Sequence, residues 1–139
     1  MYIEKTDYNN IGKEALEIVQ QSDEQNRRLA EQYAMDFAAG YLRSRYDVVK
    51  SYAKEGSERN MALVGAITDI ALYRMCLNLP ARMGLDKRKE QYDKAVEWLE
   101  SVQKAAVVLD LPGIVGADGK EDSANPIRIG TGIRNDYFW

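Results

Sequence analysis

The sequence has no histidine, one cysteine and three prolines among its 139 residues. Histidine is the commonest general base and a usual zinc ligand, so its absence removes the familiar serine and cysteine triads and most zinc sites. The single cysteine, Cys76, cannot form a disulfide within the chain, and there is no CxxC pair. We therefore expect a protein that is not an enzyme and that is made in a reducing cytoplasm.

Long apolar runs and a strong excess of one charge are missing as well. The most apolar tract, residues 61–79, is interrupted by four polar side chains, among them Asp69 and Arg74, which predicts a buried helix and not a membrane span. Residues 1–10 are polar and do not resemble a signal peptide. The net charge is −3, and a protein that coats phosphate backbones is usually basic, so nucleic acid is not favoured as the main partner.

Apolar residues recur at the helical period over most of the chain. A capping box at Ser22 and Gln25 is expected to open the second helix, and Ser57 is expected to cap the third after a break at residues 46–56. The predicted helices cover residues 11–20, 22–45, 57–79 and 85–109. Because the connections are short, we predict an all-α fold, a small antiparallel bundle of about four helices with an extended C-terminal arm.

The helix over residues 57–79 is apolar nearly all round and is expected in the middle of the bundle. On the second helix, Tyr41 belongs to the apolar face, whereas charged residues such as Arg27 and Glu31 are expected in solvent. Tyr73 and Tyr92 are also expected to pack in the core. Tyrosine is favoured at protein interfaces too, so the nine tyrosines leave a second role open.

Asp69 and Arg74 stand out on the apolar helix and allow two interpretations. They could be a catalytic or recognition pair, or a half-buried polar contact that sets helix register together with Tyr73, and we favour the second. Cys76 is interpreted as a core residue, since no base accompanies it.

Two glycine-rich stretches, GIVGADG and IGTG, match no phosphate-binding loop. The acidic residues Asp118, Glu121 and Asp122 lack the register of a calcium loop. No cofactor or metal site is therefore predicted. A basic patch (Arg43, Arg45, Lys50 and Lys54) could face DNA in a channel, but a solvated surface is the favoured interpretation.

The composition changes after Leu109, so the predicted boundary divides a helical bundle domain, 1–109, from an extended, partly flexible arm, 110–139. Half of the ten glycines fall in the arm, and GADGKEDSANP has too few apolar residues to order itself. Apolar residues then interleave with arginines, a pattern that favours docking on another chain. The predicted partner-binding residues are Ile127, Arg128, Ile129, Ile133, Arg134, Tyr137, Phe138 and Trp139.

Three stretches together resemble a known family. They are GYLRSRYDV (40–48), TDIALYRM (68–75) and RKEQYDKAVEWLESV (88–102). In this order and spacing they resemble a family of tailed-phage structural proteins typified by a small Mu-like protein, which includes head-completion and head–tail connector proteins.

The resemblance implies a neck subunit of the virion, made in the bacterial host cytoplasm, that joins a homo-oligomeric ring, a dodecamer, beneath the portal. Its partners would be copies of itself, the portal protein and tail or neck proteins; genomic DNA could pass through the lumen, and no membrane is involved. By the same resemblance the arm would reach a neighbour or the portal. Five residues of the body would be structural and not catalytic: Tyr41, Asp69, Tyr73, Tyr92 and Trp98.

The main alternative is a small helical phage DNA-packaging or DNA-binding protein, such as a small terminase subunit. The acidic composition and the lack of a polar recognition helix argue against it. A small enzyme is the weakest hypothesis, because the sequence has neither histidine nor a catalytic motif.

Overall fold

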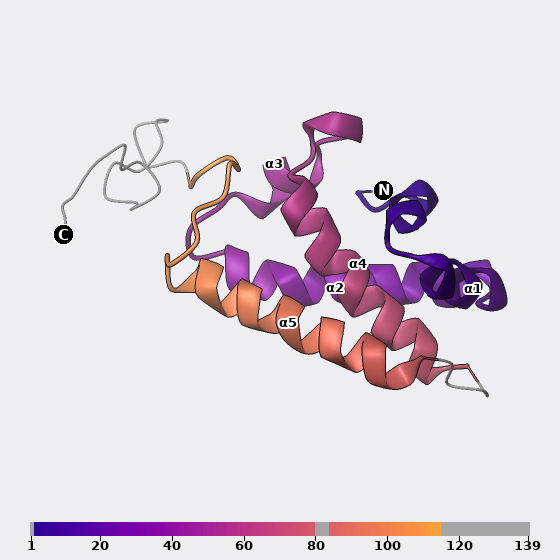
Figure 1. Ribbon diagram of the computed structural model, residues 1–139. Coiled ribbons are helices and arrows are strands. Elements are labelled where there is room, and N and C mark those ends of the chain that lie inside the picture. Colours follow the sequence, from indigo (N-terminus) through magenta and orange to yellow (C-terminus); the bar gives the residue numbers. More distant parts are fainter. Residues whose placement is uncertain (1, 80–83, 115–139) are drawn as a thin grey trace.

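The computed structural model describes residues 2–79 and 84–114 (Figure 1). Across these residues no strand forms, and a single antiparallel bridge joins Tyr46 to Gly113. The all-α prediction is confirmed. In chain order the elements are η1 (Lys5–Asn10), α1 (Lys13–Gln21), α2 (Glu24–Leu42), α3 (Val48–Tyr52), η2 (Gly56–Glu58), α4 (Met61–Leu77) and α5 (Leu85–Gln103).

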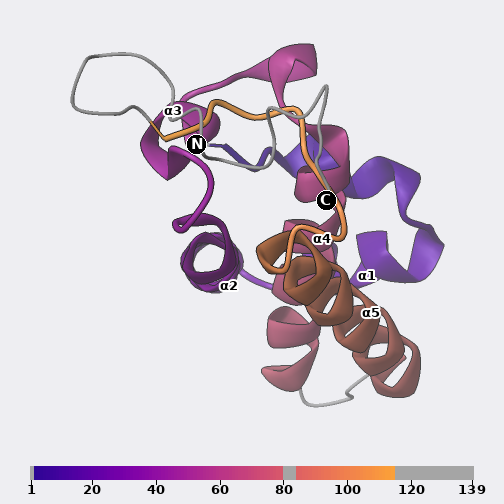
Figure 2. The same cartoon turned by 90° about the vertical axis from the view of Figure 1, so that its left-hand side faces the viewer.

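Helix α4 occupies the centre of the bundle. It packs against α5 and α2, and α1 and η1 cover it from a further side. Figure 2 looks along α2 and shows α4 flanked by α2 on one side and by α5 and α1 on the other. Helices α2, α4 and α5 alternate in direction (Figure 1). The connection between α4 and α5 is short, whereas the connection between α2 and α4 is longer than expected and contains α3 and η2.

The burial of α4 explains why its sequence is apolar nearly all round. Its buried positions fall on every side of the helix, and each large one contributes about 1.5–3 kcal/mol when it leaves water. These positions are Leu63, Val64, Ala66, Ile67, Thr68, Ile70, Ala71, Leu72, Met75 and Cys76.

Two predicted helix starts were wrong by one to three residues. Helix α2 is capped by Asp23, whose carboxylate accepts a hydrogen bond from the backbone N–H of Asn26, while Ser22 closes α1 by donating to the Ile18 carbonyl. Helix α4 is capped by Asn60 and not by Ser57. The reason for the second shift is Arg59, which is buried and has extended backbone, so the helix begins after it.

The predicted ends of the second and last helices also need correction. Helix α5 stops at Gln103 and not near Leu109, because Ala105 adopts a left-handed conformation with φ 64°. The N–H groups of Ala106 and Val107 then turn back to the Ser101 carbonyl. Helix α2 ends at Leu42, and the expected break after it contains the short helix α3, which Asp47 caps by accepting from the Lys50 N–H.

The chain after α5 returns along the body to Tyr46. The Tyr46 hydroxyl accepts a hydrogen bond from the Leu109 N–H at 2.9 Å, and the Asp47 N–H donates to the Pro112 carbonyl at 2.9 Å. Residues 110–114, the beginning of the predicted arm, therefore lie on the bundle. All eight predicted partner-binding residues of the arm lie outside the described residues.

Candidate assembly surfaces

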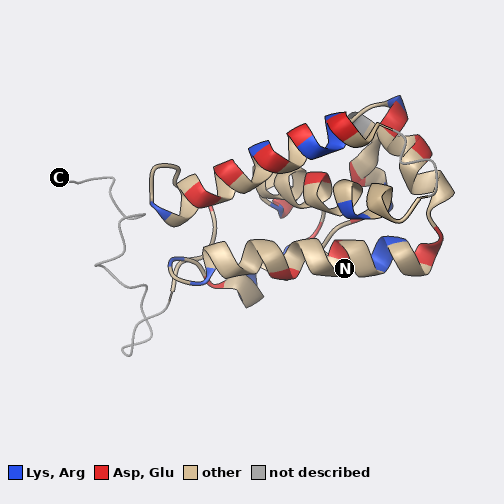
Figure 3. Cartoon of the chain, turned by 90° about the horizontal axis from the view of Figure 1, so that it is seen from below, with Lys and Arg blue, Asp and Glu red and all other residues tan. Residues whose placement is uncertain are grey.

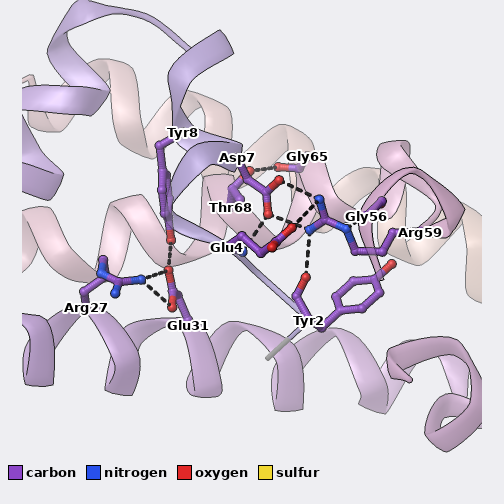
Figure 4. A network of polar contacts seen from close by, with 10 residues as sticks. All are labelled: Tyr2, Glu4, Asp7, Tyr8, Arg27, Glu31, Gly56, Arg59, Gly65 and Thr68. Carbon is purple, nitrogen blue, oxygen red and sulfur yellow. Dashed lines mark hydrogen bonds and ion pairs between the residues drawn. The ribbon is translucent and has the colours of Figure 1, made fainter. Parts of the chain in front are cut away.

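Arg59 ties the first residues of the chain to the start of α4 (Figure 4). Its guanidinium donates to both carboxylate oxygens of Asp7, at 2.6 and 2.8 Å, and to the Tyr2 carbonyl at 2.7 Å. Burial alone would raise the pKa of Asp7, but hydrogen bonds from Arg59 and from the Glu4 N–H outweigh it and hold the pKa below its ordinary value. This charged cluster is satisfied internally and has a structural role.

A second buried cluster centres on Glu31, which is fully buried, so the prediction that it is solvated was wrong. Tyr8 donates to its carboxylate at 2.6 Å, and Arg27 donates to both oxygens at 3.0 and 3.1 Å (Figure 4). Burial and the Glu31 carboxylate both raise the pKa of the Tyr8 phenol. The sequence pattern missed this cluster because Tyr8 comes from a segment 23 residues away.

Exposed apolar side chains gather where α2 and the end of α4 meet. Leu29 is 61 % exposed, and Tyr33 and Leu77 are 38 % and 36 % exposed. The Arg74 guanidinium lies over the Tyr33 ring at 3.8 Å from its centroid, a cation–π contact that joins the two helices. We call these four residues the α2–α4 surface. Exposed apolar side chains next to Tyr and Arg, two residue types enriched at binding hot spots, suit contact with another protein.

An aromatic row continues from this surface toward α5. On α2, Tyr33, Phe37 and Tyr41 follow one another at a spacing of four residues, with ring centroids 6.1 and 5.5 Å apart. Tyr92 of α5 meets Phe37 at 6.4 Å and Tyr73 of α4 at 4.7 Å. Tyr41, Tyr73 and Tyr92 are half-buried, so the row lies at the edge of the core.

The structure does not bring Asp69 and Arg74 together: Arg74 contacts α2, whereas the charge that acts on Asp69 is Arg88 of α5. Arg88 is 3 % exposed, and its Nε and Nη1 atoms have no hydrogen-bond partner within the described part of the chain. Sequence reasoning missed Arg88, although it falls on the same helical stripe as Tyr92 and Ala95. The predicted polar contact between Asp69 and Arg74 was therefore wrong, because the charged side chain that acts on Asp69 is Arg88.

A hollow of about 270 Å³ opens between α4 and α5 beside Asp69. Burial raises the pKa of the half-buried Asp69 carboxyl to about 6, and the charge of Arg88 lowers it only in part. Trp98, half-buried and packed against the core, forms the opposite wall. The lining residues are Ala62, Gly65, Ala66, Asp69, Lys94, Ala95 and Trp98.

The predicted basic patch lies at the corner between α2 and α3. Arg43, Lys50 and Lys54 are exposed, whereas Arg45 is half-buried and donates to the Gln103 carbonyl at 2.9 Å. Along α5 acidic and basic residues are interspersed (Figure 3).

Within residues 2–79 and 84–114, no group of three or more acidic or cysteine side chains is placed to hold a metal ion. In the same residues, no helix is long and apolar enough to cross a membrane. Comparisons of the chain with protein-family models, with curated proteins and with solved structures found no match.

Proposed function

We propose that this chain is a structural subunit of a tailed-phage virion, a head–tail connector that forms a ring beneath the portal. The observation that carries the proposal is the α2–α4 surface, on which Leu29, Tyr33 and Leu77 are exposed to solvent. The buried charges of the body, Glu31 and Arg59, already have hydrogen-bond partners within the chain. The resemblance of the three motifs to the phage connector family supports the proposed location of this assembly role in the virion.

Assembly would use contacts between unlike surfaces of neighbouring copies. A head-to-tail contact of this kind closes into a ring when each copy is rotated by a fixed angle from the last. Each contact can be weak in isolation, since repetition around the ring multiplies its effect. No catalytic step is part of the proposal, and the half-buried side chains Tyr41, Asp69, Tyr73, Tyr92 and Trp98 serve the fold and its contacts.

The direct test is quantitative mass spectrometry of purified virions together with electron microscopy of the neck. We expect about a dozen copies per particle, located at the neck, which is the copy number that the resemblance to the connector family implies for a closed ring. Absence of the chain from mature particles would contradict the connector proposal.

A matched pair of variants tests the α2–α4 surface in the same experiment. Leu29→Asp places a charge in this surface and should reduce incorporation into particles at least about tenfold, since the charge would be buried unpaired at the contact. Val49→Asp is the control, because Val49 is 81 % exposed on α3, away from this surface. Equal incorporation of the two variants would show that the surface is not used.

The alternative function, DNA binding, is favoured by one observation, the exposed side chains of Arg43, Lys50 and Lys54. It predicts a gel shift with double-stranded DNA that weakens steeply as salt increases. Loss of that shift in a variant with all three changed to Gln, together with absence from virions, would replace the connector proposal by this one.

A further inference from the structure

The hollow between α4 and α5 combines three features that suit one kind of ligand. Ala62, Gly65 and Ala66 form a shallow floor, and small side chains allow a second chain to approach closely. Trp98 offers a half-buried indole, on which a guanidinium can stack. The Asp69 carboxylate accepts no hydrogen bond from any described residue. A short segment with an arginine between apolar residues would satisfy all three.

The basic side chains that the structure describes near Asp69 do not form a hydrogen bond or ion pair with its carboxylate, which can therefore pair with such an arginine. Arg88 of α5 acts on Asp69 through its charge, without hydrogen bonding to it. Lys94, at the rim of the hollow, pairs with Glu90 at 3.6 Å, and its side chain is 67 % exposed. Since burial raises the pKa of Asp69 to about 6, a cation bound there would recover solvation that the carboxylate lacks.

The chain itself contains the matching segment. Residues 127–134 read IRIGTGIR, in which Arg128 stands between Ile127 and Ile129 and Arg134 follows Ile133. In an extended conformation alternate side chains point to opposite sides, so apolar groups and arginines would separate onto two faces. The arginine face also carries Gly130 and Gly132, so its backbone can lie close to the small residues of the floor while the two arginines reach the carboxylate and the indole at its ends.

The length of chain beyond the body allows this segment to reach a neighbouring copy. The described chain stays on the body as far as Ile114, since Gly113 is bridged to Tyr46 and the Pro112 carbonyl accepts a hydrogen bond from the Asp47 N–H. The linker of residues 115–126 spans up to about 40 Å when extended, which is about the width of a domain of this size. This span is long enough for residues 127–134 to pass their own body and meet a second copy, as the ring of the proposed function requires.

We propose that the hollow between α4 and α5 receives residues 127–134 of a second copy, with an arginine of that segment paired to Asp69. The proposal rests on the proposed function and deepens it by naming the surface that receives the arm. The contact joins unlike parts of two copies, so it has the asymmetry that ring formation needs.

Exchange of engineered cysteines between full-length chains tests the contact. One chain carries Ala62→Cys and the other Gly132→Cys, a position on the same face of the extended segment as the arginines; the native Cys76 is buried in both. After mixing and oxidation at high protein concentration, we expect a disulfide between the two variants, identified by mass spectrometry. Ala53→Cys is the matched control, because Ala53 is also an exposed alanine but lies beyond α3.

Asp69→Asn in the Ala62→Cys chain should lower the yield of the crosslink about tenfold, as the loss of a charge-assisted pair implies. Glu97→Gln, which removes an exposed carboxylate of α5 outside the hollow, should leave the yield unchanged. A yield no higher than that of Ala53→Cys, or a crosslink formed only within a single doubly substituted chain, would overturn the proposal.

The two proposals can fail separately. Absence of the crosslink with normal copy number in virions would remove only the assignment of the hollow. If the crosslink forms between copies but the chain is absent from virions, the connector role is wrong and the contact between copies remains supported.

Discussion

At the scale of single residues, the buried charged groups differ in the hydrogen bonds that the described chain supplies to them. Arg59 and Glu31 are each held by several hydrogen bonds within the chain. Arg88 and Asp69 instead share a low-polarity interface without a direct bond, which is costly unless something else supplies a partner. The Arg59 and Glu31 clusters stabilise the fold, whereas the described chain supplies no hydrogen-bond partner to the buried Nε and Nη1 atoms of Arg88.

The Asp7–Arg59 pair gives a prediction for acid stability. The pKa of Asp7 is lowered in the folded protein, so its contribution to the free energy of unfolding is complete well above the ordinary value of 3.8 and is lost as the pH falls through the folded pKa. We expect Asp7→Asn to reduce the free energy of unfolding by about 3 kcal/mol at neutral pH, because Arg59 stays buried with a poorer partner. The difference should shrink toward about pH 2.

Urea unfolding at several pH values measures this effect. Asp93→Asn is the control: its pair with Lys89 is exposed, and it should cost less than about 1 kcal/mol. If the two variants lost equal stability, or if the loss for Asp7→Asn did not depend on pH, the proposed role of the buried pair would be wrong.

At the scale of elements, helix starts depend on side chains whose partners come from elsewhere in the fold. Helix α4 cannot begin before Asn60, since the backbone at Arg59 is extended where its side chain reaches Asp7 and the Tyr2 carbonyl. The capping role therefore passes to Asn60, although Ser57 follows a glycine and is an equally good capping residue type.

The assignment of the cap to Asn60 predicts that two alanine variants lose different amounts of stability. Asn60→Ala removes the side-chain oxygen that accepts from the Leu63 N–H and should lower the free energy of unfolding by about 1 kcal/mol. Ser57→Ala should change it by less than about 0.5 kcal/mol, as is usual for an exposed position with no cap. Thermal and urea unfolding of both variants measures the difference, and a larger loss for Ser57→Ala would contradict this assignment of the cap.

At the scale of the whole molecule, the described body contains a core of its own. Among residues 2–79 and 84–114, the buried residues that form this core lie between Tyr2 and Leu109, and the chain stays on the body as far as Ile114. The α2–α4 surface and the hollow beside Asp69 lie on this body, whereas the predicted docking residues of the arm lie outside it.

Deletion of residues 127–139 should therefore separate folding from assembly. We expect the shortened chain to keep the helical circular dichroism spectrum and the unfolding midpoint of the full chain, since no described core residue is removed. It should no longer join particles when it is the only copy supplied, because the segment that reaches a partner is gone. Incorporation at the normal level would contradict a role for the arm in assembly.

The sequence by itself determined the fold class, the central place of residues 61–77 and the approximate positions of four helices. This was possible because the helical period of apolar residues is a local property, and the central helix is apolar on all sides. The absence of histidine and of nucleotide motifs likewise narrowed the range of functions that the chain could be proposed to have.

Only the tertiary structure decided which charges are buried and what they meet. Glu31 has the sequence context of a solvated residue, yet Tyr8 folds over it, and Arg74 stacks on Tyr33 of another helix in place of pairing with Asp69. The end of α5 is set by the left-handed Ala105 and by the return of the chain to Tyr46. These contacts join residues distant in sequence, and their geometry depends on how the helices pack, which no local pattern of residues records.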